Sequence, residues 1–206
     1  MTLARLLAQQ LGKPSGITSA LAAALWNRRN ASLNDVTFDS LGLRANDRVL
    51  EVGFGGGYLL DLMSTAVTSG LLVGVDVSPA IVASCERRYR SLIREGRLQL
   101  RCAPAESLPY PAEYFNKACS VNSVFYWADV QGGLSELARV LTRDGCLVLC
   151  FTCKESLEDR SFAEHVRLYE EDEIQQMAVS CGFQVITKRL SDKHREFLRM
   201  IARKRS

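Results

Sequence analysis

The stretch RVLEVGFGGGY, from Arg48 to Tyr58, joins a short apolar run to a turn built almost entirely of glycine. Val49, Leu50 and Val52 are typical of a strand that is buried on both faces of a sheet. The glycines that follow permit positive φ and let a ligand approach the main chain. The next segment, YLLDLMSTA, predicts a helix whose first amides point toward that ligand. The stretch therefore predicts a strand, turn and helix with a ligand at the turn.

A second apolar run, LLVGVD, predicts another buried strand that ends in an acid, Asp76. A carboxylate at that point can accept hydrogen bonds from both hydroxyls of a ribose. The dinucleotide fingerprint G-x-G-x-x-G/A starts correctly at Gly53 and Gly55, but its sixth position is Tyr58, which is too large for close packing of helix on strand. The fingerprint of a dinucleotide site is therefore not met.

An acid two residues before a G-x-G-x-G turn closely resembles motif I of the class I S-adenosyl-L-methionine (SAM) methyltransferases. The resemblance implies that this acid and the glycines face the amino acid part of SAM. It also implies that the acid after the second strand holds the ribose. The positions that match, with their neighbours, are Glu51, Gly53, Phe54, Gly55, Gly57, Asp76 and Val77.

Composition indicates a single globular domain. A chain of 206 residues with 47% hydrophobic content can bury one substantial core, and a net charge of +3 is too small to indicate nucleic-acid binding. Apolar runs stay below the ~18 residues that cross a bilayer, and no signal-peptide cleavage site is seen, so we expect a cytoplasmic protein. The seven cysteines show no disulfide-scaffold spacing, and Cys150-Phe-Thr-Cys153 lacks the second pair of a zinc site, so no metal is expected.

Residues 1–40 are interpreted as an N-terminal helical lid segment and residues 41–206 as the methyltransferase domain. The amphipathic part of the lid segment carries Leu33 and Val36 near helical spacing. Two interpretations stay open. The segment packs against the sheet edge, or it is a lid whose Trp26, Asn27 and Asn30 face cofactor or substrate.

The segment after Asp76 predicts a helix, because Ser78 is a good N-cap and Pro79 suits the first helical position. Gly96 is expected to end it. A charged face on this helix is expected to be solvated rather than to bind anything, and consists of Glu86, Arg87, Arg88, Arg90, Arg94 and Glu95.

The segment PAESLP after the third predicted strand resembles the motif on the adenine side of the family's cofactor site. Pro104 stands where the family usually carries an acid that accepts from the adenine amino group. The resemblance leaves the amide of Ala105 for a ring nitrogen, and Glu106 for the amino group. The sequence therefore leaves one contact to the adenine unassigned.

The fourth predicted strand, KACSVNSVFYWAD, carries polar and aromatic residues at its end. Ligands of doubly wound folds bind beyond the carboxyl ends of the strands, so these residues are expected to line the floor or wall of the site. We interpret Asn122 as a cofactor contact and Tyr126 and Trp127 as substrate contacts, with core packing as the alternative. For Phe125 we expect core packing.

The remainder follows the family's order. The sequence predicts a helix from Gln131, a fifth strand, a second substrate loop at 154–168 and a helix from Glu170, and then a closing antiparallel hairpin. His165 and Tyr169 are substrate candidates in and beside that loop. The resemblance covers residues 44–204 and implies a doubly wound, Rossmann-like α/β sheet of about seven mostly parallel strands.

Methyl transfer from SAM needs a nucleophile held in line with the sulfonium methyl, and proximity supplies much of the barrier reduction. No dedicated catalytic residue is required, and Glu106, Tyr126 and His165 are candidates for a general base. The pattern looks like the small-molecule, type 11 branch that includes ubiquinone and menaquinone biosynthesis methyltransferases. We therefore expect a small apolar or aromatic acceptor. An RNA or protein methyltransferase and a non-catalytic SAM-binding partner are the alternatives.

Overall fold

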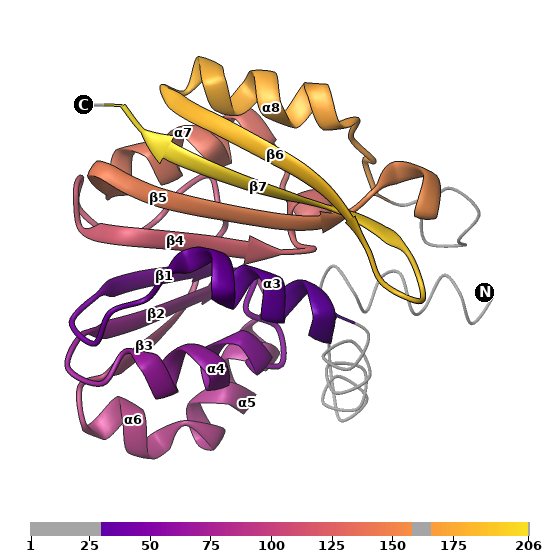
Figure 1. Cartoon of the computed structure of the whole chain (residues 1–206). Coiled ribbons are helices and arrows are strands. Elements are labelled where there is room, and N and C mark those ends of the chain that lie inside the picture. The colour runs from indigo at the N-terminus through magenta and orange to yellow at the C-terminus, as the bar shows by residue number, and fades with distance from the viewer. Residues whose placement is uncertain (1–29, 158–165, 206) are drawn as a thin grey trace.

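The computed structural model describes residues 30–157 and 166–205. Within them, seven strands form one sheet in the order β3-β2-β1-β4-β5-β7-β6 (Figure 1). β1 to β5 run parallel, whereas β7 is antiparallel to both β5 and β6. This arrangement confirms the predicted doubly wound sheet with a closing hairpin. The strands are β1 (Arg48–Val52), β2 (Leu71–Asp76), β3 (Leu98–Cys102), β4 (Phe115–Val121), β5 (Leu141–Thr152), β6 (Phe183–Ser191) and β7 (Glu196–Lys204).

Helices cover both faces of this sheet, so the described chain has three layers (Figure 1). One face carries α3 (Ala31–Leu41), α4 (Tyr58–Ala66), α5 (Pro79–Arg88) and the short α6 (Arg90–Arg94). The other face carries α7 (Val130–Val140) and α8 (Glu171–Ser180).

The core consists of two layers of apolar side chains, one on each face of the sheet. Because successive strand residues point to opposite faces, Leu50 packs toward α7 and α8, and its neighbour Val49 packs toward α3 and α4. Both are fully buried. Burying one such side chain stabilises the fold by ~1.5–3 kcal/mol before the entropy cost, so the central strands anchor the residues at their ends.

Helix α3 is the first element of the described chain, and it packs directly on the sheet. Leu33 and Leu41 are buried in the cluster of that face, and the hydroxyl of Thr37 donates to the carbonyl of Leu33 at 2.7 Å. Gly42 ends the helix at φ 55°, and the ammonium of Lys117 donates to the carbonyl of Leu41 at 2.7 Å, where a cation suits the helix dipole. Residues 31–41 thus belong to the layers of the sheet, while Trp26 and Asn27 lie outside the described residues.

Two predicted element boundaries are wrong. β4 ends at Val121 rather than continuing, because Asn122 adopts a left-handed conformation with φ 52°, and a 3₁₀ turn follows at Val124–Tyr126. The helix predicted to continue to Gly96 is broken at Tyr89 into α5 and α6. The start signal at Ser78 is confirmed, because its hydroxyl accepts from the amide of Ile81 at 3.4 Å.

The described part of the chain contains no helix that is long and apolar enough to cross a membrane. All seven cysteines fall within it, and each is a free thiol.

Candidate functional site

The carboxyl ends of β1 and β2 lie side by side, since Val52 pairs with Val75, and this brings the glycine turn against Asp76. The amide of Gly55 donates to Oδ2 of Asp76 at 3.1 Å, and the amide of Ser78 donates to Oδ1 at 2.9 Å. Each carboxylate oxygen has a second lone pair. Asp76 can therefore hold the turn and still accept hydrogen bonds from a ligand.

The three glycines predicted to contact the cofactor have different surroundings. A Cβ on Gly53 would lie 2.3 Å from Cβ of Ser123, and a Cβ on Gly57 would lie 2.4 Å from Oη of Tyr89. Gly55, at φ 51°, has no other atom within 4 Å of that position. Gly53 and Gly57 are thus required for packing inside the protein, whereas Gly55 leaves open space for a ligand beside the backbone.

Glu51 is the most unusual charged group of this region. Its side chain is buried, and its Oε2 atom has no hydrogen-bond partner within the described chain. Burial, and to a lesser extent the nearby negative charges of Asp76 and Asp61, raises the pKa of this carboxyl to about 8. A buried, unpaired carboxyl group among other acids suits a cationic ligand group, such as the ammonium of the expected cofactor.

The residues expected around the adenine lie in the loop after β3, and α7 holds this loop in place. The carboxylate of Glu136 accepts from the amide of Leu108 at 2.9 Å, and Arg139 donates to the carbonyl of Leu108 at 3.1 Å. Ala105 is buried, and Oε1 of Glu106 accepts from the amide of Asp129 at 2.9 Å. Glu106 is thereby tied to the residue before α7, which weakens its candidacy as a general base.

Val77 and Phe54 flank the cofactor turn in opposite ways. Val77 is 42% exposed beside Asp76, which is unusual for a large apolar side chain and suits contact with a flat ring. The side chain of Phe54 is buried. Its ring lies only 2.7 Å from the position that a Cβ on Gly74 would occupy. A cofactor contact of Phe54 would therefore come from its backbone.

Asn122 lies at the end of β4, and its side chain is used within the protein. Its Oδ1 atom accepts from the amide of Thr152 at 2.8 Å, which joins the ends of β4 and β5. Its Nδ2 atom donates to Oδ1 of Asn30 at 2.9 Å. The structure thus brings together Asn30 and Asn122, two predicted site residues that are far apart in the sequence.

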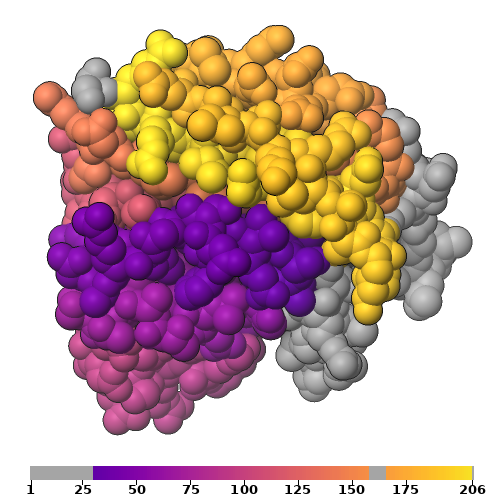
Figure 2. Space-filling view, in the orientation of Figure 1, coloured from indigo at the N-terminus to yellow at the C-terminus, as the bar shows by residue number. Residues whose placement is uncertain are grey.

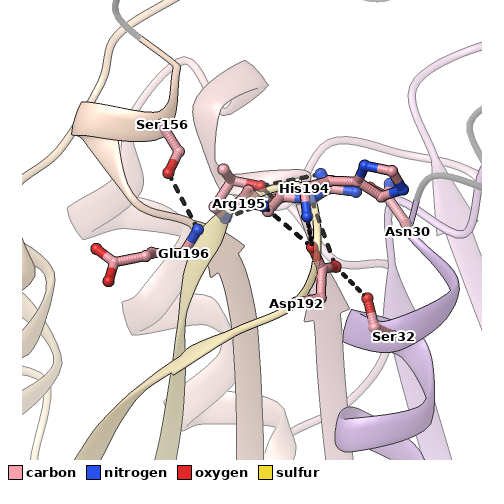
Figure 3. A network of polar contacts seen from close by, with 9 residues as sticks. Asn30, Ser32, Ser156, Asp192, His194, Arg195 and Glu196 are labelled. Atoms are coloured by element: carbon pink, nitrogen blue, oxygen red, sulfur yellow. Dashed lines mark hydrogen bonds and ion pairs between the residues drawn. The ribbon is translucent and has the colours of Figure 1, made fainter.

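Asn30 is also held by the turn between β6 and β7 (Figure 3). Nη1 of Arg195 donates to Oδ1 of Asn30 and to the hydroxyl of Thr152, each at 3.2 Å. Asp192 accepts from the hydroxyl of Ser32 and lies 3.9 Å from Nε of the buried Arg195. Sequence reasoning missed this turn. Its only local signal is an acid three residues before an arginine, a pattern that does not reveal a partner at the other end of the chain.

The aromatic residues after β4 are packed to different degrees. Phe125 is buried and meets Phe151 edge to face at 6.0 Å, which confirms its predicted core role. Nε1 of Trp127 donates to the hydroxyl of Ser123 at 3.1 Å, and its ring occupies the space that a side chain on Gly133 would need. Tyr126 is partly exposed, and burial raises the pKa of its phenol to about 12. Tyr126 is therefore a neutral phenol at physiological pH and a hydrogen-bond donor rather than a base.

Of the remaining predicted substrate residues, the structure describes Tyr169. Tyr169 is buried in the core, and the guanidinium of Arg167 lies 4.7 Å from the centre of its ring. Trp26 and His165 lie outside the described residues.

The six charged residues of the predicted solvated face are exposed, as expected, and Arg88 also reaches back to the glycine turn. Its guanidinium donates to the carbonyl of Gly56 at 2.8 Å and forms an ion pair with Asp61.

Metal binding was not predicted. Across residues 30–157 and 166–205 no group of three or more potential metal-binding side chains is present. Burial raises the pKa of Cys150 to about 12 and that of Cys153 to about 11, so both remain protonated at neutral pH.

Comparison with known proteins agrees with this geometry. A family model described as a methyltransferase domain matches residues 50–149. An uncharacterized methyltransferase of Bacillus subtilis (strain 168), YdaC, is 30% identical over 136 residues, which cover 66% of this chain and 73% of that protein. A demethylmenaquinone methyltransferase of Tropheryma whipplei (strain Twist) is 29% identical over 163 residues, which cover 79% of this chain and 62% of that protein.

The fold is shared with solved enzymes as well. The structure of geranyl diphosphate methyltransferase in complex with SAM superposes with a TM-score of 0.74 at 14% identity, covering 95% of this chain and 94% of that one. The fold, the family model and the relatives agree with the strand, turn and acid at the ends of β1 and β2. The chain therefore belongs to the class I SAM-dependent methyltransferases, enzymes that use SAM as their methyl donor.

Proposed function

We propose that this enzyme transfers the methyl group of SAM to a small, mainly apolar or aromatic acceptor. The similarity to a demethylmenaquinone methyltransferase supports an acceptor of this class, because a quinol is a small aromatic molecule. The partly exposed phenol of Tyr126, just beyond the end of β4, supports the same class.

The observation that carries the proposed cofactor site is the open space beside Gly55, with Asp76 bonded to the turn and Glu51 buried behind it. In the proposed arrangement, the ammonium of SAM lies toward Glu51 and the ribose hydroxyls lie at Asp76. The adenine lies between Val77 and the loop at Ala105. Gly53 and Gly57 shape the turn from within rather than touching the ligand.

SAM, when bound, supplies an electrophilic methyl group on its sulfonium. The protein then has to hold the acceptor in line and exclude water, and such positioning can supply ~7 to 11 kcal/mol of the barrier reduction. Tyr126 is protonated at neutral pH and can donate to an acceptor oxygen, and Glu106 is tied to the amide of Asp129. Neither of these two described residues is poised as a base, and such a site suits an acceptor that is already nucleophilic, such as an ionised phenol or a neutral amine.

The test begins with calorimetric titration of SAM and of its demethylated product into the purified protein. Methyl release is then measured across quinols, phenols and amines of matched size, with RNA and folded proteins in parallel. We expect SAM binding in the micromolar range and turnover of a small apolar acceptor. Methylation confined to RNA or to folded protein would overturn the proposed acceptor class while leaving the cofactor site intact.

Variants of Tyr126 distinguish effects on the acceptor from effects on SAM binding. Tyr126→Ala should change acceptor preference or turnover much more than SAM affinity, because Tyr126 follows β4, and β1 separates β4 from the strand that ends at Asp76. Tyr126→Phe isolates the hydroxyl. Tyr114→Phe is the matched control, since Tyr114 precedes β4 and therefore lies at the opposite end of that strand.

A further inference from the structure

Three consecutive carbonyls of the glycine turn receive hydrogen bonds from the second half of α5 and from Tyr89, the residue that follows it. Sγ of Cys85 donates to the carbonyl of Gly55 at 3.5 Å. Nη1 of Arg88 donates to the carbonyl of Gly56 at 2.8 Å, and Oη of Tyr89 donates to that of Gly57 at 2.7 Å. The Gly57 carbonyl also accepts from the amide of Asp61 at 3.0 Å, so the turn is held from α5 and from α4, and its peptide planes have little freedom to rotate.

The two stronger donors share an anchor on α4. The single proton of Oη of Tyr89 is shared between the carbonyl of Gly57 and Oδ1 of Asp61 at 2.8 Å, and Oδ2 of the same carboxylate pairs with Arg88. Asp61 sits in the first turn of α4, directly after the glycines, where a carboxylate also suits the helix dipole. The end of α5, the start of α4 and the turn between β1 and α4 are thus one connected unit.

The orientation of these carbonyls decides where the amides point. In a planar trans peptide the N–H lies opposite the C=O, so a Gly55 carbonyl directed at α5 turns the amide of Gly56 away from α5. The same holds for the Gly57 carbonyl and the amide of Tyr58. Within the described chain neither amide donates to a protein acceptor, so both remain available at the N-terminus of α4.

Tyr89 also defines the shape of the turn. Its side chain is buried, and a Cβ on Gly57 would meet Oη at 2.4 Å and Cε2 at 2.8 Å. The phenol therefore occupies the space of a missing side chain. Burial raises the pKa of this phenol, with the hydrogen bond to Asp61 acting in the same direction, so it remains a donor across the physiological range.

We propose that Arg88 and Tyr89 are positioning residues for the cofactor, which fix the glycine turn from behind so that its amides and the open face of Gly55 are set for SAM. The proposal rests on the proposed cofactor site and deepens it. Neither residue touches the ligand. Both act through the backbone of residues 55–57.

Tyr89→Phe tests this because it keeps the ring and removes the hydroxyl. A turn that spends only a tenth of its time in the binding conformation binds SAM about tenfold more weakly, and we expect the dissociation constant to rise by up to this factor. The KM for SAM should rise by a similar factor, while kcat at saturating SAM stays within about twofold. Amide hydrogen exchange of residues 55–58 should become faster in the unliganded protein.

The controls separate positioning from general stability. Tyr114→Phe makes the same chemical change just before β4, at the end of the strands opposite the glycine turn, and should leave the dissociation constant of SAM unchanged. Arg88→Met and Arg87→Met compare neighbouring arginines on α5, both exposed, of which only Arg88 contacts the turn. Arg88→Met should weaken SAM binding and Arg87→Met should not. Arg88→Lys keeps the charge beside Asp61 and should recover part of the affinity.

The outcomes distinguish the two proposals. If the wild-type protein bound no SAM, the proposed cofactor site would fail. If the wild type bound SAM and both Tyr89→Phe and Arg88→Met bound it equally well, only the positioning role would be lost. A fall in kcat with an unchanged KM for SAM in either variant would also contradict it. Arg88→Met keeps the test decisive should Tyr89→Phe not fold, because Arg88 is half exposed.

Discussion

The amide of Gly55 donates to the carboxylate of Asp76 across 3.1 Å, so one hydrogen bond joins the turn after β1 to the end of β2. Asp76→Ala removes this bond together with the proposed bonds to the ribose, each worth ~1.5 to 3 kcal/mol when charge-assisted. We expect SAM affinity to fall at least tenfold by calorimetry. Asp39→Ala, an exposed acid on α3, is the control. Unchanged SAM affinity in the Asp76 variant would show that this acid is not a cofactor residue.

Glu51 should make the unliganded protein less stable as the pH rises. Its folded-state pKa of about 8 lies above the ordinary value of 4.5, so the folded state binds the proton more tightly than the unfolded state does. The stabilising contribution is complete below pH 4.5 and is lost as the pH rises through about 8. Glu51→Gln should flatten the decline in melting temperature over this range, and the exposed Glu86→Gln should not. An equal decline in both variants would contradict the assignment.

The same carboxyl should couple SAM binding to proton release. An ammonium placed at Glu51 pairs with the ionised form, so binding at neutral pH has to remove the proton that burial retains. Calorimetry in buffers of different ionisation enthalpy should detect a released proton in the wild type and none in Glu51→Gln. A binding enthalpy independent of the buffer would place the ammonium elsewhere.

Gly55 and Gly57 should respond differently to the same substitution. Both have positive φ, which costs an alanine ~1–2 kcal/mol, but only a side chain on Gly57 collides with Tyr89. Gly57→Ala should therefore lower the free energy of unfolding in urea by clearly more than Gly55→Ala does. Gly55→Val should retain the fold and lose SAM binding, because its side chain fills the open approach to the backbone. Normal SAM binding by Gly55→Val would remove Gly55 from the site.

Asn122 allows backbone strain to be separated from hydrogen bonding. Asn122→Gly loses the side-chain bonds to Thr152 and Asn30 but adopts φ 52° freely. Asn122→Ala loses the same bonds and also has to adopt a left-handed conformation that is unfavourable for alanine. The alanine variant should be less stable than the glycine variant by ~1 kcal/mol in urea denaturation, the reverse of their usual order. The usual order would mean that the turn relaxes to negative φ.

Pro104 should tolerate an acid. Pro104 is exposed, and its carbonyl accepts from the amide of Ser107 at 3.3 Å, a bond that aspartate retains. Pro104→Asp should tighten SAM binding or leave it unchanged, because an acid there can accept from the adenine amino group. Pro111→Asp, at another exposed proline, is the control. Substantial weakening confined to Pro104→Asp would show that this loop does not lie at the adenine.

Local signals predicted the fold well because they act over a few residues. Ser78 with Pro79 begins α5, and the run of apolar residues before the glycines forms β1. Contacts with partners far away along the chain could not be predicted from the sequence. Nothing beside Arg88 reveals that it reaches Gly56, and nothing near Arg195 indicates Asn30 as its partner. The role of Trp127 likewise depends on the lack of a side chain on Gly133, which lies on another element.

The contact between Ser32 and Asp192 spans 160 positions of the chain, and the space-filling view shows α3 lying against the closing hairpin (Figure 2). During synthesis the chain emerges from its N-terminus, so the polar partners of the first turn of α3 are made almost last. The central strands can pair while this turn still lacks Asp192 and Arg195. The apolar packing of α3 on β4 and β5 can therefore precede its polar contacts with the β6–β7 turn, which require residues 192 and 195.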